Sequence, residues 1–353
     1  MATSAEPVDE LGALWAWFVP FFEGYSPIYG AVSETVARDA ELLALIREAP
    51  PSGHQPTSLL AAVHYLVLEG LDHPLADVYA GGSDADPGPL FREVCLEHRA
   101  AVIDLLATRR VQTNEVGRSA LIGPALTWAD RDGEGLQLVD VGCSAGLNLL
   151  CDRYLLDYGG RGRTGPADAA VRIPCEVLGG APPIAPRLPE LHHRVGIDID
   201  PPDLADPNDA RWLLACVWPD TGRLPRTEAA IRLAREDPPP VLHGDALATL
   251  PTVLDDLGPG RVCILTTWSF SYLLVEDRAR FVELLTAAGR RRPITWIAGD
   301  GSGVVDVVDA GPPPTDGRGA ADVLSAVTFD GGTPRPGVLA FVQSHGAWID
   351  WLA

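Results

Sequence analysis

The chain has 353 residues and a formal net charge of −21, and 46% of its residues are hydrophobic. This length and apolar content predict either one large globular domain or two ordinary ones. A surface this acidic repels phosphate backbones, so no nucleic-acid partner is expected, whereas a small molecule or a neutral or basic protein is compatible with it.

All 27 basic residues are arginine, which excludes a Schiff-base, pyridoxal-phosphate or P-loop lysine in this chain. The six cysteines form no C-x-x-C pair and no histidine pair has ligand spacing, so no metal site is predicted. The N-terminal residues lack the pattern of a signal peptide, and no apolar run is long enough to span a membrane. We therefore expect a soluble, cytoplasmic protein without a membrane partner.

Residues 9 to about 130 show apolar positions at helical spacing and contain no convincing strand. From residue 136, short apolar runs alternate with helical segments, and the Gly- and Pro-rich residues 159–192 resemble an insertion. The sequence therefore predicts an N-terminal helical domain over 1–130 and an α/β domain over 131–353. The apolar runs are LQLVDV, HRVGIDID, PVLHGDAL, RVCILTTW and PITWIAGD, followed by ADVLSAVTF and GVLAFVQSH.

Strands that alternate with helices predict a parallel sheet with right-handed crossovers. The last two runs are joined by a short segment containing glycine, which predicts an antiparallel C-terminal edge. Five parallel strands with such an edge are typical of the Rossmann-like sheet of class I S-adenosylmethionine (AdoMet) methyltransferases. The expected fold class is therefore α/β, with this sheet and an N-terminal helical domain.

Residues 142–146, which follow the first run, allow two interpretations. Their sequence, GCSAG, fits the G-x-S-x-G turn that carries the nucleophile of a serine hydrolase. Ser144, Asp300 and His345 also follow the serine, acid, histidine order of that fold. Against this interpretation, about 130 mostly helical residues precede the turn, and no HGGG-type oxyanion loop lies upstream.

The second interpretation is a cofactor loop that Asp140 opens, and we favour it because it accounts for more residues. Gly142 allows a tight turn, and Ser144 and Gly146 keep the side-chain volume small. A helix predicted from about Ala145 would direct backbone N–H groups at the ligand.

Acidic residues at two later strand ends support the cofactor loop. Asp198 is the candidate for the ribose hydroxyls, although it lies 58 residues after Asp140, which requires the insertion to loop out. Asp245 ends the third run, where it could accept a hydrogen bond from the adenine amino group. Asn148 and Ala246 complete the predicted cofactor-binding residues.

Residues near the end of the fourth strand are candidates for the reaction itself, since ligands bind at strand ends in open sheets. Ser269 and Tyr272 could orient a nucleophile, and Trp268 could stack on a substrate. The alternative is that these aromatic residues belong to the core. His345 is a further catalytic candidate because the pKa of histidine suits proton transfer, although a lone histidine after a strand is usually structural.

The segment TNEVGR, residues 113–118, supplies two substrate-binding candidates. Asn114 could instead cap a helix, but capping does not require Arg118. Arg118 could bind a carboxylate of AdoMet or of a substrate, or form a structural salt bridge. Tyr29, in SPIYG, is a weaker substrate-binding candidate.

The chain resembles an uncharacterised bacterial family, domain of unknown function 2332, over nearly its whole length. The resemblance is carried by SPIYG, TNEVGR, VDVGCSAGLNLLCDRY, RVGIDIDPPD, WLLACVWPD and HGAWIDWL. The family is similar to class I AdoMet methyltransferases in its central motifs, so the resemblance implies that fold and, less directly, that cofactor. It implies no particular reaction.

Three functions remain open on the sequence. The first is an AdoMet-dependent methyltransferase acting on a small molecule. The second is a serine hydrolase that uses Ser144, Asp300 and His345. The third is a non-catalytic subunit with the AdoMet-binding fold that serves as a partner of another protein.

Overall fold

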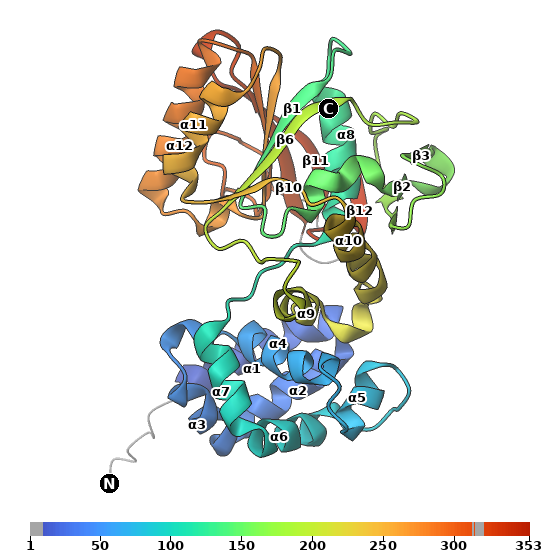
Figure 1. Ribbon diagram of the computed structural model, residues 1–353, viewed down its shortest axis with the longest axis vertical. Coiled ribbons are helices and arrows are strands. Elements are labelled where there is room, and N and C mark those ends of the chain that lie inside the picture. Colours follow the sequence, from blue (N-terminus) through green and yellow to red (C-terminus); the bar gives the residue numbers. More distant parts are fainter. Residues whose placement is uncertain (1–9, 313, 315–320) are drawn as a thin grey trace. The chain divides into compact units, whose positions relative to one another are not determined.

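The structure is a computed structural model that describes residues 10–312, 314 and 321–353 (Figure 1). It divides into two compact units. The helical unit comprises the residues up to Thr113 together with Ala205–Pro225, and the sheet unit comprises Asn114–Leu204 and Arg226–Ala353. The division falls at residue 113 rather than near 130, and a later segment of the chain joins the helical unit.

The helical unit contains short helices that begin at well-defined caps. Ser26 caps α2, because its Oγ accepts a hydrogen bond from the backbone N–H of Tyr29 over 3.1 Å and Pro27 follows at the first helical position. Asp39 ends α2 and caps α3. The helices are α1 (Glu10–Tyr25), α2 (Pro27–Arg38), α3 (Ala40–Glu48), α4 (Pro56–Leu68), α5 (Pro74–Tyr79), α6 (Pro87–Glu97), α7 (Arg99–Thr108) and α9 (Pro207–Ala215).

Two tryptophans attach residues 205–225 to the helical unit. The indole N–H of Trp212 donates to the carbonyl of Arg110 over 2.7 Å. The ring of Trp218 packs edge-on against Phe22, with ring centroids 5.2 Å apart. Such contacts combine burial of a large apolar ring with a satisfied polar group, which explains why this segment belongs to the helical unit despite its position in the sequence.

The sheet unit is built on a sheet of nine strands in the order β5-β12-β11-β10-β9-β8-β1-β6-β7. Strands β7, β6, β1, β8 and β9 are parallel, as predicted, whereas β10 and β11 run antiparallel to their neighbours. The main strands are β1 (Leu136–Val141), β6 (Leu191–Asp198), β7 (Val241–His243), β8 (Val262–Thr267), β9 (Ile294–Asp300), β10 (Asp322–Thr328), β11 (Arg335–Val342) and β12 (Trp348–Trp351).

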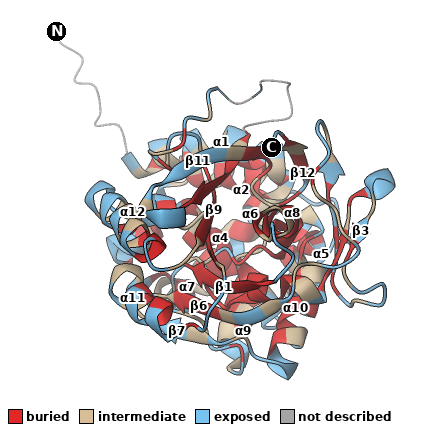
Figure 2. Cartoon of the chain, turned by 90° about the horizontal axis from the view of Figure 1, so that it is seen from above, coloured by how far each residue is buried: buried red, intermediate tan, exposed pale blue. Residues whose placement is uncertain are grey.

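Helices cover both faces of the parallel strands. Val139 and Val141 of β1 share a hydrophobic core with side chains of α11 (Ala246–Asp256) and α12 (Val275–Gly289). Because side chains alternate along a strand, Asp140 points to the opposite face, where Figure 1 shows α8 (Ser119–Ala129). Figure 2 shows β1 and β9 buried between these layers. Burial on both faces explains why the sequences of β1 and β8 are mainly apolar, and every residue of both strands is buried.

The predicted insertion, 159–192, forms most of a second, small sheet. This sheet has the order β3-β2-β4, with β2 (Leu155–Asp157), β3 (Arg163–Thr164) and β4 (Arg172–Pro174). The next strand, β5 (Glu176–Val177), pairs in parallel with β12 of the large sheet. The antiparallel edge predicted from β10 and β11 is therefore extended by two further strands. Helix α10 (Leu224–Glu236) precedes β7.

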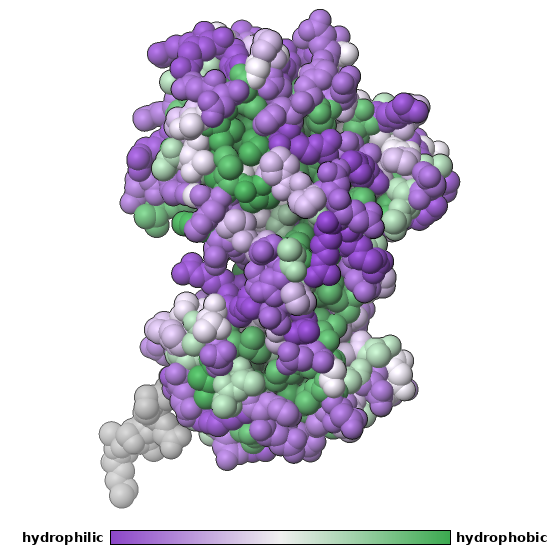
Figure 3. Space-filling view, in the orientation of Figure 1, coloured by the Kyte–Doolittle hydropathy of each residue, from purple (hydrophilic) through white to green (hydrophobic). Residues whose placement is uncertain are grey.

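The surface drawn in Figure 3 is mainly hydrophilic, with hydrophobic side chains gathered in smaller areas. Among the residues that the structure describes, no helix has both the length and the apolar character to cross a membrane. The same residues contain no group of three or more histidine, cysteine, aspartate or glutamate side chains that could hold a metal ion.

Candidate ligand site at the carboxyl ends of the parallel strands

The order of the parallel strands reverses at β1, which lies between β6 and β8. In open parallel sheets, ligands bind outside the carboxyl ends of the strands at such a reversal. Two turns meet there: residues 142–146 after β1, here called the glycine-rich turn, and residues 268–272 after β8, the tryptophan turn. They are joined by Ser269, whose Oγ donates to the carbonyl of Val141 over 2.6 Å.

The backbone of the glycine-rich turn enters the left-handed region three times, with φ of 76° at Gly142, 53° at Ser144 and 74° at Gly146. A Cβ atom at Gly142 would lie 2.3 Å from the Cβ of Ser269, and one at Gly146 would lie 2.9 Å from the side chain of Val241. Both glycines are thus required by conformation and by packing. Ser144 holds a conformation that costs a serine free energy.

The helix predicted from about Ala145 is present as a 3-10 helix, η3 (Leu147–Arg153), which begins directly after the turn. The backbone N–H of Leu149 donates to the carbonyl of Gly146, three residues earlier, over 3.0 Å, and the carbonyl of Leu147 accepts the hydroxyl of Tyr154 over 2.6 Å. The backbone N–H of Leu147 donates to Oδ1 of Asn114 over 3.1 Å. Asn114 therefore caps η3, and this N–H is satisfied within the chain.

Asp198, at the end of β6, lies against the glycine-rich turn. Its Oδ2 accepts the backbone N–H of Ser144 over 2.7 Å, and its Oδ1 accepts that of Asp200 over 3.0 Å. Each carboxylate oxygen can accept a second hydrogen bond. Asp198 is only partly buried, so it combines contact with the turn and access to a ligand.

Asp140 is a buried carboxyl group at the end of β1, with a side chain 1% exposed. Neither of its oxygens has a hydrogen-bond partner within the described part of the chain. Burial raises its pKa from 3.8 to about 7; Arg118 opposes this shift, and the negative charge of Asp198 adds to it. A buried acid without partners is costly, which makes Asp140 the most unusual group of the site.

Arg118 reaches the same region from the segment that leads into α8. It is 7% exposed, and burial lowers its pKa to about 10. Its Nε donates to the carbonyl of Ser344 over 3.1 Å, and its Nη1 to that of Thr267 over 3.0 Å. The guanidinium also lies 4.6 Å from the ring centroid of Trp268. Arg118 therefore joins the segment before α8 to the ends of β8 and β11, which are distant from it in the sequence.

The tryptophan turn begins with a second strained residue, since Trp268 has a φ of 55°. Its backbone N–H donates to Gly299 over 2.6 Å, and its Nε1 donates to Oδ2 of Asp322 over 2.7 Å. A Cβ atom at Gly299 would lie 2.9 Å from the indole ring. The ring is thus fixed between the backbone of β9 and the guanidinium of Arg118. Tyr272, in the same turn, is 87% exposed.

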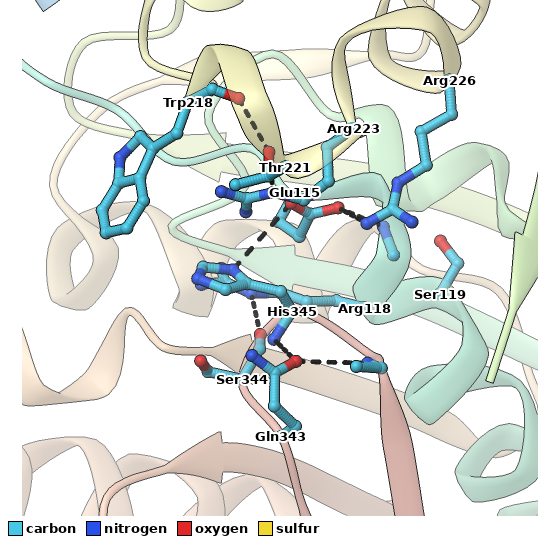
Figure 4. A network of polar contacts seen from close by, with 12 residues as sticks. Glu115, Arg118, Ser119, Trp218, Thr221, Arg223, Arg226, Gln343, Ser344 and His345 are labelled. Carbon is cyan, nitrogen blue, oxygen red and sulfur yellow. Dashed lines mark hydrogen bonds and ion pairs between the residues drawn. The ribbon is translucent and has the colours of Figure 1, made fainter. Parts of the chain in front are cut away.

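Glu115, Arg226 and His345 form a neighbouring polar network (Figure 4). The side chain of Glu115 is 1% exposed, and its Oε1 accepts from Arg226 Nη2 over 2.7 Å and from the backbone N–H of Gly117 over 2.8 Å. Nδ1 of His345 lies 3.9 Å from Oε2 of Glu115. The acid nearest to His345 in this network is therefore Glu115, beyond hydrogen-bond distance.

Asp300, the acid of the candidate hydrolase triad, binds backbone instead. Its Oδ2 accepts from the N–H of Ser271 over 3.0 Å, and its Oδ1 from that of Gly301 over 3.1 Å. Burial raises its pKa, and these hydrogen bonds oppose the shift. Asp300 thus orders the tryptophan turn, a role that the sequence pattern does not indicate.

The other predicted site residues have structural contacts of their own. Asn148 is buried, and its Oδ1 accepts from Ser119 Oγ over 3.0 Å. Asp245 caps α11, whose first residue is Ala246, by accepting the N–H of Ala248 over 2.9 Å. Tyr29 belongs to the helical unit, where it is 1% exposed.

Asp322, Gly299 and Arg226 carry no sequence signal that would single them out. Asp322 begins a strand after a long Gly- and Pro-rich segment, and Gly299 is one glycine among 36. Their importance follows from contacts between strand ends that are far apart in the sequence.

We expect Gly142→Ala to lower the free energy of unfolding by about 2–4 kcal/mol, because the new methyl group would meet Ser269 and the backbone would be strained. Ser144→Gly should change it by less than about 1 kcal/mol, since relief of strain offsets the greater freedom of glycine in the unfolded chain. Urea unfolding of both variants measures the difference. Equal stabilities would contradict the packing described for the two turns.

The model of the family described as "Uncharacterized protein conserved in bacteria (DUF2332)" matches residues 21–351. No curated protein matches the chain. The match covers both units, including the glycine-rich turn, Asp198 and the tryptophan turn.

Proposed function

The chain belongs to this uncharacterised bacterial family, and from its own site we propose that it is an AdoMet-dependent methyltransferase acting on a small molecule. The observation that carries the proposal is the hydrogen bond between Asp198 and Ser144. This hydrogen bond brings Asp198, at the end of β6, onto the glycine-rich turn that follows β1. In Rossmann-type sites, that acid binds ribose hydroxyls beside such a turn.

The residues present fit this cofactor. Both oxygens of Asp198 can accept from a ribose diol while keeping their backbone hydrogen bonds. Asp140 is a buried carboxyl group without partners among the described residues, and AdoMet is a cation with an ammonium and a sulfonium group. Gly142, Ser144, Gly146 and Asn148 would surround the cofactor in this proposal. The 3-10 geometry of η3 weakens one argument for it, because the helix that directly follows the turn is not an α-helix.

AdoMet supplies an electrophilic methyl group when it is bound. The chain then has to orient the acceptor and exclude water, which can provide much of the acceleration of such a transfer. The tryptophan turn is the part of the site suited to orientation, because Asp300 accepts the backbone N–H of Ser271 within the turn and Arg118 covers the ring of Trp268. The hydroxyl of Ser269 donates to a backbone carbonyl, so its proposed role is to position the two turns rather than to exchange protons.

The proposal includes a cytoplasmic location, which the cysteines support. All six are free, at positions 95, 143, 151, 175, 216 and 263. Burial raises the pKa of Cys175 and of Cys216 to about 12, so these thiols are unreactive and behave as small apolar groups.

One observation favours the serine hydrolase as a second candidate. Ser144 has the positive φ that a nucleophile on a sharp strand-to-helix turn adopts. However, Asp300 accepts backbone N–H groups, and the acid within 4 Å of His345 is Glu115, whose Oε2 lies 3.9 Å from Nδ1. These partners differ from the serine, histidine and acid chain that the mechanism needs.

Calorimetry with AdoMet and S-adenosylhomocysteine tests the proposed function. We expect both to bind the wild type, and Asp198→Asn to weaken both about 10- to 100-fold, because hydrogen bonds to a charged acceptor contribute about 1.5–3 kcal/mol. Asp255→Asn is the control, because this exposed acid pairs with Arg291 and is not among the predicted site residues, so the variant should retain binding.

Two results would reject this function. The first is a wild-type protein that binds neither compound at millimolar concentration. The second is stoichiometric labelling by a fluorophosphonate probe that is lost in Ser144→Gly, which would establish the hydrolase instead.

A further inference from the structure

Among the residues that the structure describes, Ser144 and Trp268 are the two besides glycine that have a positive φ. A tryptophan in this conformation is a genuine outlier, because its bulky side chain crowds the backbone. Such a residue persists only where its surroundings hold it, and outliers of this kind gather at ligand sites. The contacts that hold Trp268 therefore matter for the function of the two turns.

Three groups hold Trp268. Its backbone N–H donates to the carbonyl of Gly299 over 2.6 Å, and the guanidinium of Arg118 lies 4.6 Å from its ring centroid. Its indole N–H donates to Oδ2 of Asp322 over 2.7 Å. This last contact fixes how the ring is turned, because the indole has a single donor that points in one direction. Asp322 thus restrains the side chain of a residue whose backbone is strained.

The conformation of Trp268 decides where Ser269 lies, because Ser269 is the next residue of the chain. Oγ of Ser269 donates to the carbonyl of Val141 over 2.6 Å, and a Cβ atom at Gly142 would come within 2.3 Å of the Cβ of Ser269. A change of φ at Trp268 would move Ser269 away from both residues. The tryptophan turn therefore holds the first residue of the glycine-rich turn in place.

The row of contacts continues to β6, since the N–H of Ser144 donates to Oδ2 of Asp198 over 2.7 Å. Its links run from Asp322 of β10, past the end of β9, to the turns after β8 and β1 and to the end of β6. Strands β10 and β6 are four places apart in the sheet, which corresponds to about 19 Å. Asp322 is thus too far from Asp198 for both to contact one ribose.

We propose that Asp322 is a positioning residue for the ligand of the glycine-rich turn, acting through Trp268 and Ser269. The carboxylate holds the indole, and the strained backbone places Ser269 against Gly142. The glycine-rich turn then keeps the shape in which it meets Asp198. Such preorganisation improves binding, because the turn does not have to be ordered when the ligand arrives. The assignment of that ligand as AdoMet rests on the function proposed above, whereas the row of contacts does not.

Calorimetry with S-adenosylhomocysteine on the full chain tests this role. Asp322→Leu removes the acceptor and should weaken binding about 10-fold, although the side chain does not touch the ligand. Asp322→Asn keeps an oxygen for the indole N–H, so its affinity should stay within about 2-fold of the wild type. Equal losses in Asp322→Leu and Asp322→Asn would assign the effect to charge and overturn the positioning role.

Ser325→Ala is the matched control on the same strand. The hydroxyl of Ser325 also donates from β10 to the backbone of β9, over 3.3 Å, but its acceptor is Ala298, which lies outside both turns. This variant should retain the wild-type affinity. A loss in Ser325→Ala equal to that in Asp322→Leu would show that any weakening of β10 lowers affinity, and would overturn the inference.

Trp268→Phe interrupts the same row of contacts at its middle, because it removes the indole N–H and keeps an aromatic ring. It should weaken S-adenosylhomocysteine about as much as Asp322→Leu, and combining the two should add little further loss. Additive losses would overturn the route through Trp268. Trp268→Phe also supplies the test by itself should Asp322→Leu fail to fold.

Hydrogen exchange provides a measurement that needs no ligand. The backbone N–H of Ser144 should exchange at least 10-fold faster, to order of magnitude about one decade, in Asp322→Leu than in the wild type, and Asp322→Asn should leave it unchanged. A wild type that does not bind S-adenosylhomocysteine, together with this faster exchange, would reject the methyltransferase function and support the positioning of the turn by Asp322. Unchanged exchange at Ser144 in Asp322→Leu would overturn the inference.

Discussion

Asp140→Asn is expected to raise the free energy of unfolding at pH 8 by about 4 kcal/mol. In the folded protein, burial raises the pKa of Asp140 from its ordinary value of 3.8 to about 7. At pH 8 the wild type therefore keeps an ionised carboxylate where the fold favours a neutral group. Each pKa unit corresponds to about 1.4 kcal/mol, and asparagine removes the charge at nearly constant volume.

The sign of the pH dependence follows from the same values. Between about pH 4 and pH 7 the folded protein holds a proton that the unfolded chain releases. Wild-type stability that is fully present below pH 4 is therefore lost as the pH rises to about 7. Asp140→Asn should lack this component, so the two proteins should be similar near pH 4 and differ most at pH 8.

Urea unfolding between pH 4 and pH 8 measures this difference. Asp255→Asn, which neutralises an acid with a side chain 62% exposed, is the control and should keep the wild-type dependence on pH. Parallel curves for the wild type and Asp140→Asn would contradict the raised pKa. A gain in stability on loss of Asp140 would be typical of a residue that serves function at the expense of the fold.

Arg118→Met is expected to destabilise the protein by about 3 kcal/mol. The variant leaves the carbonyls of Thr267 and Ser344 without their donors and removes the cation from beside Asp140 and Trp268. Methionine fills part of the volume, so the loss reflects mainly the broken polar contacts of a buried group. Thermal or urea unfolding at pH 8 provides the measurement.

A double-mutant cycle identifies the cause of this loss. Asp140→Asn should stabilise the Arg118→Met variant by about 1–2 kcal/mol more than it stabilises the wild type, because Arg118→Met leaves an ionised Asp140 without its neighbouring cation. Arg278→Met is a matched control, since Arg278 also donates to two backbone carbonyls and lies 5.9 Å from a ring centroid, that of Phe270, but in a more accessible position. Its loss should stay below about 1 kcal/mol. Additive single effects, or an equal loss in Arg278→Met, would contradict the coupling of Arg118 to Asp140.

The parallel part of the sheet could be predicted because its strands are buried on both faces. The run LQLVDV forms β1, and the run RVCILTT forms β8 from its second residue onward. Every residue of both strands is buried. Such runs stand out against the 3.6-residue spacing of the helices between them. The helical character of the first unit could be predicted for the same reason.

Other elements depended on partners that no local pattern reveals. Trp348–Trp351 forms β12 because β11 offers it an edge, and residues 205–225 join the helical unit because Trp212 and Trp218 pack there. The turn after β1 leads into a 3-10 helix whose first residue, Leu147, is held by side chains distant in the sequence or beyond the helix, since its N–H donates to Asn114 and its carbonyl accepts from Tyr154.

The candidate site shows the same contrast. Asp140, Asp198 and the glycines of the turn could be found from the sequence by their positions at strand ends. The unpaired state of Asp140, the stacking of Arg118 on Trp268 and the hydrogen bond from Trp268 to Asp322 are decided by the tertiary structure. Periodicity records which face of a strand is buried, whereas the pKa and the partners of a side chain depend on groups that only folding brings within a few ångströms.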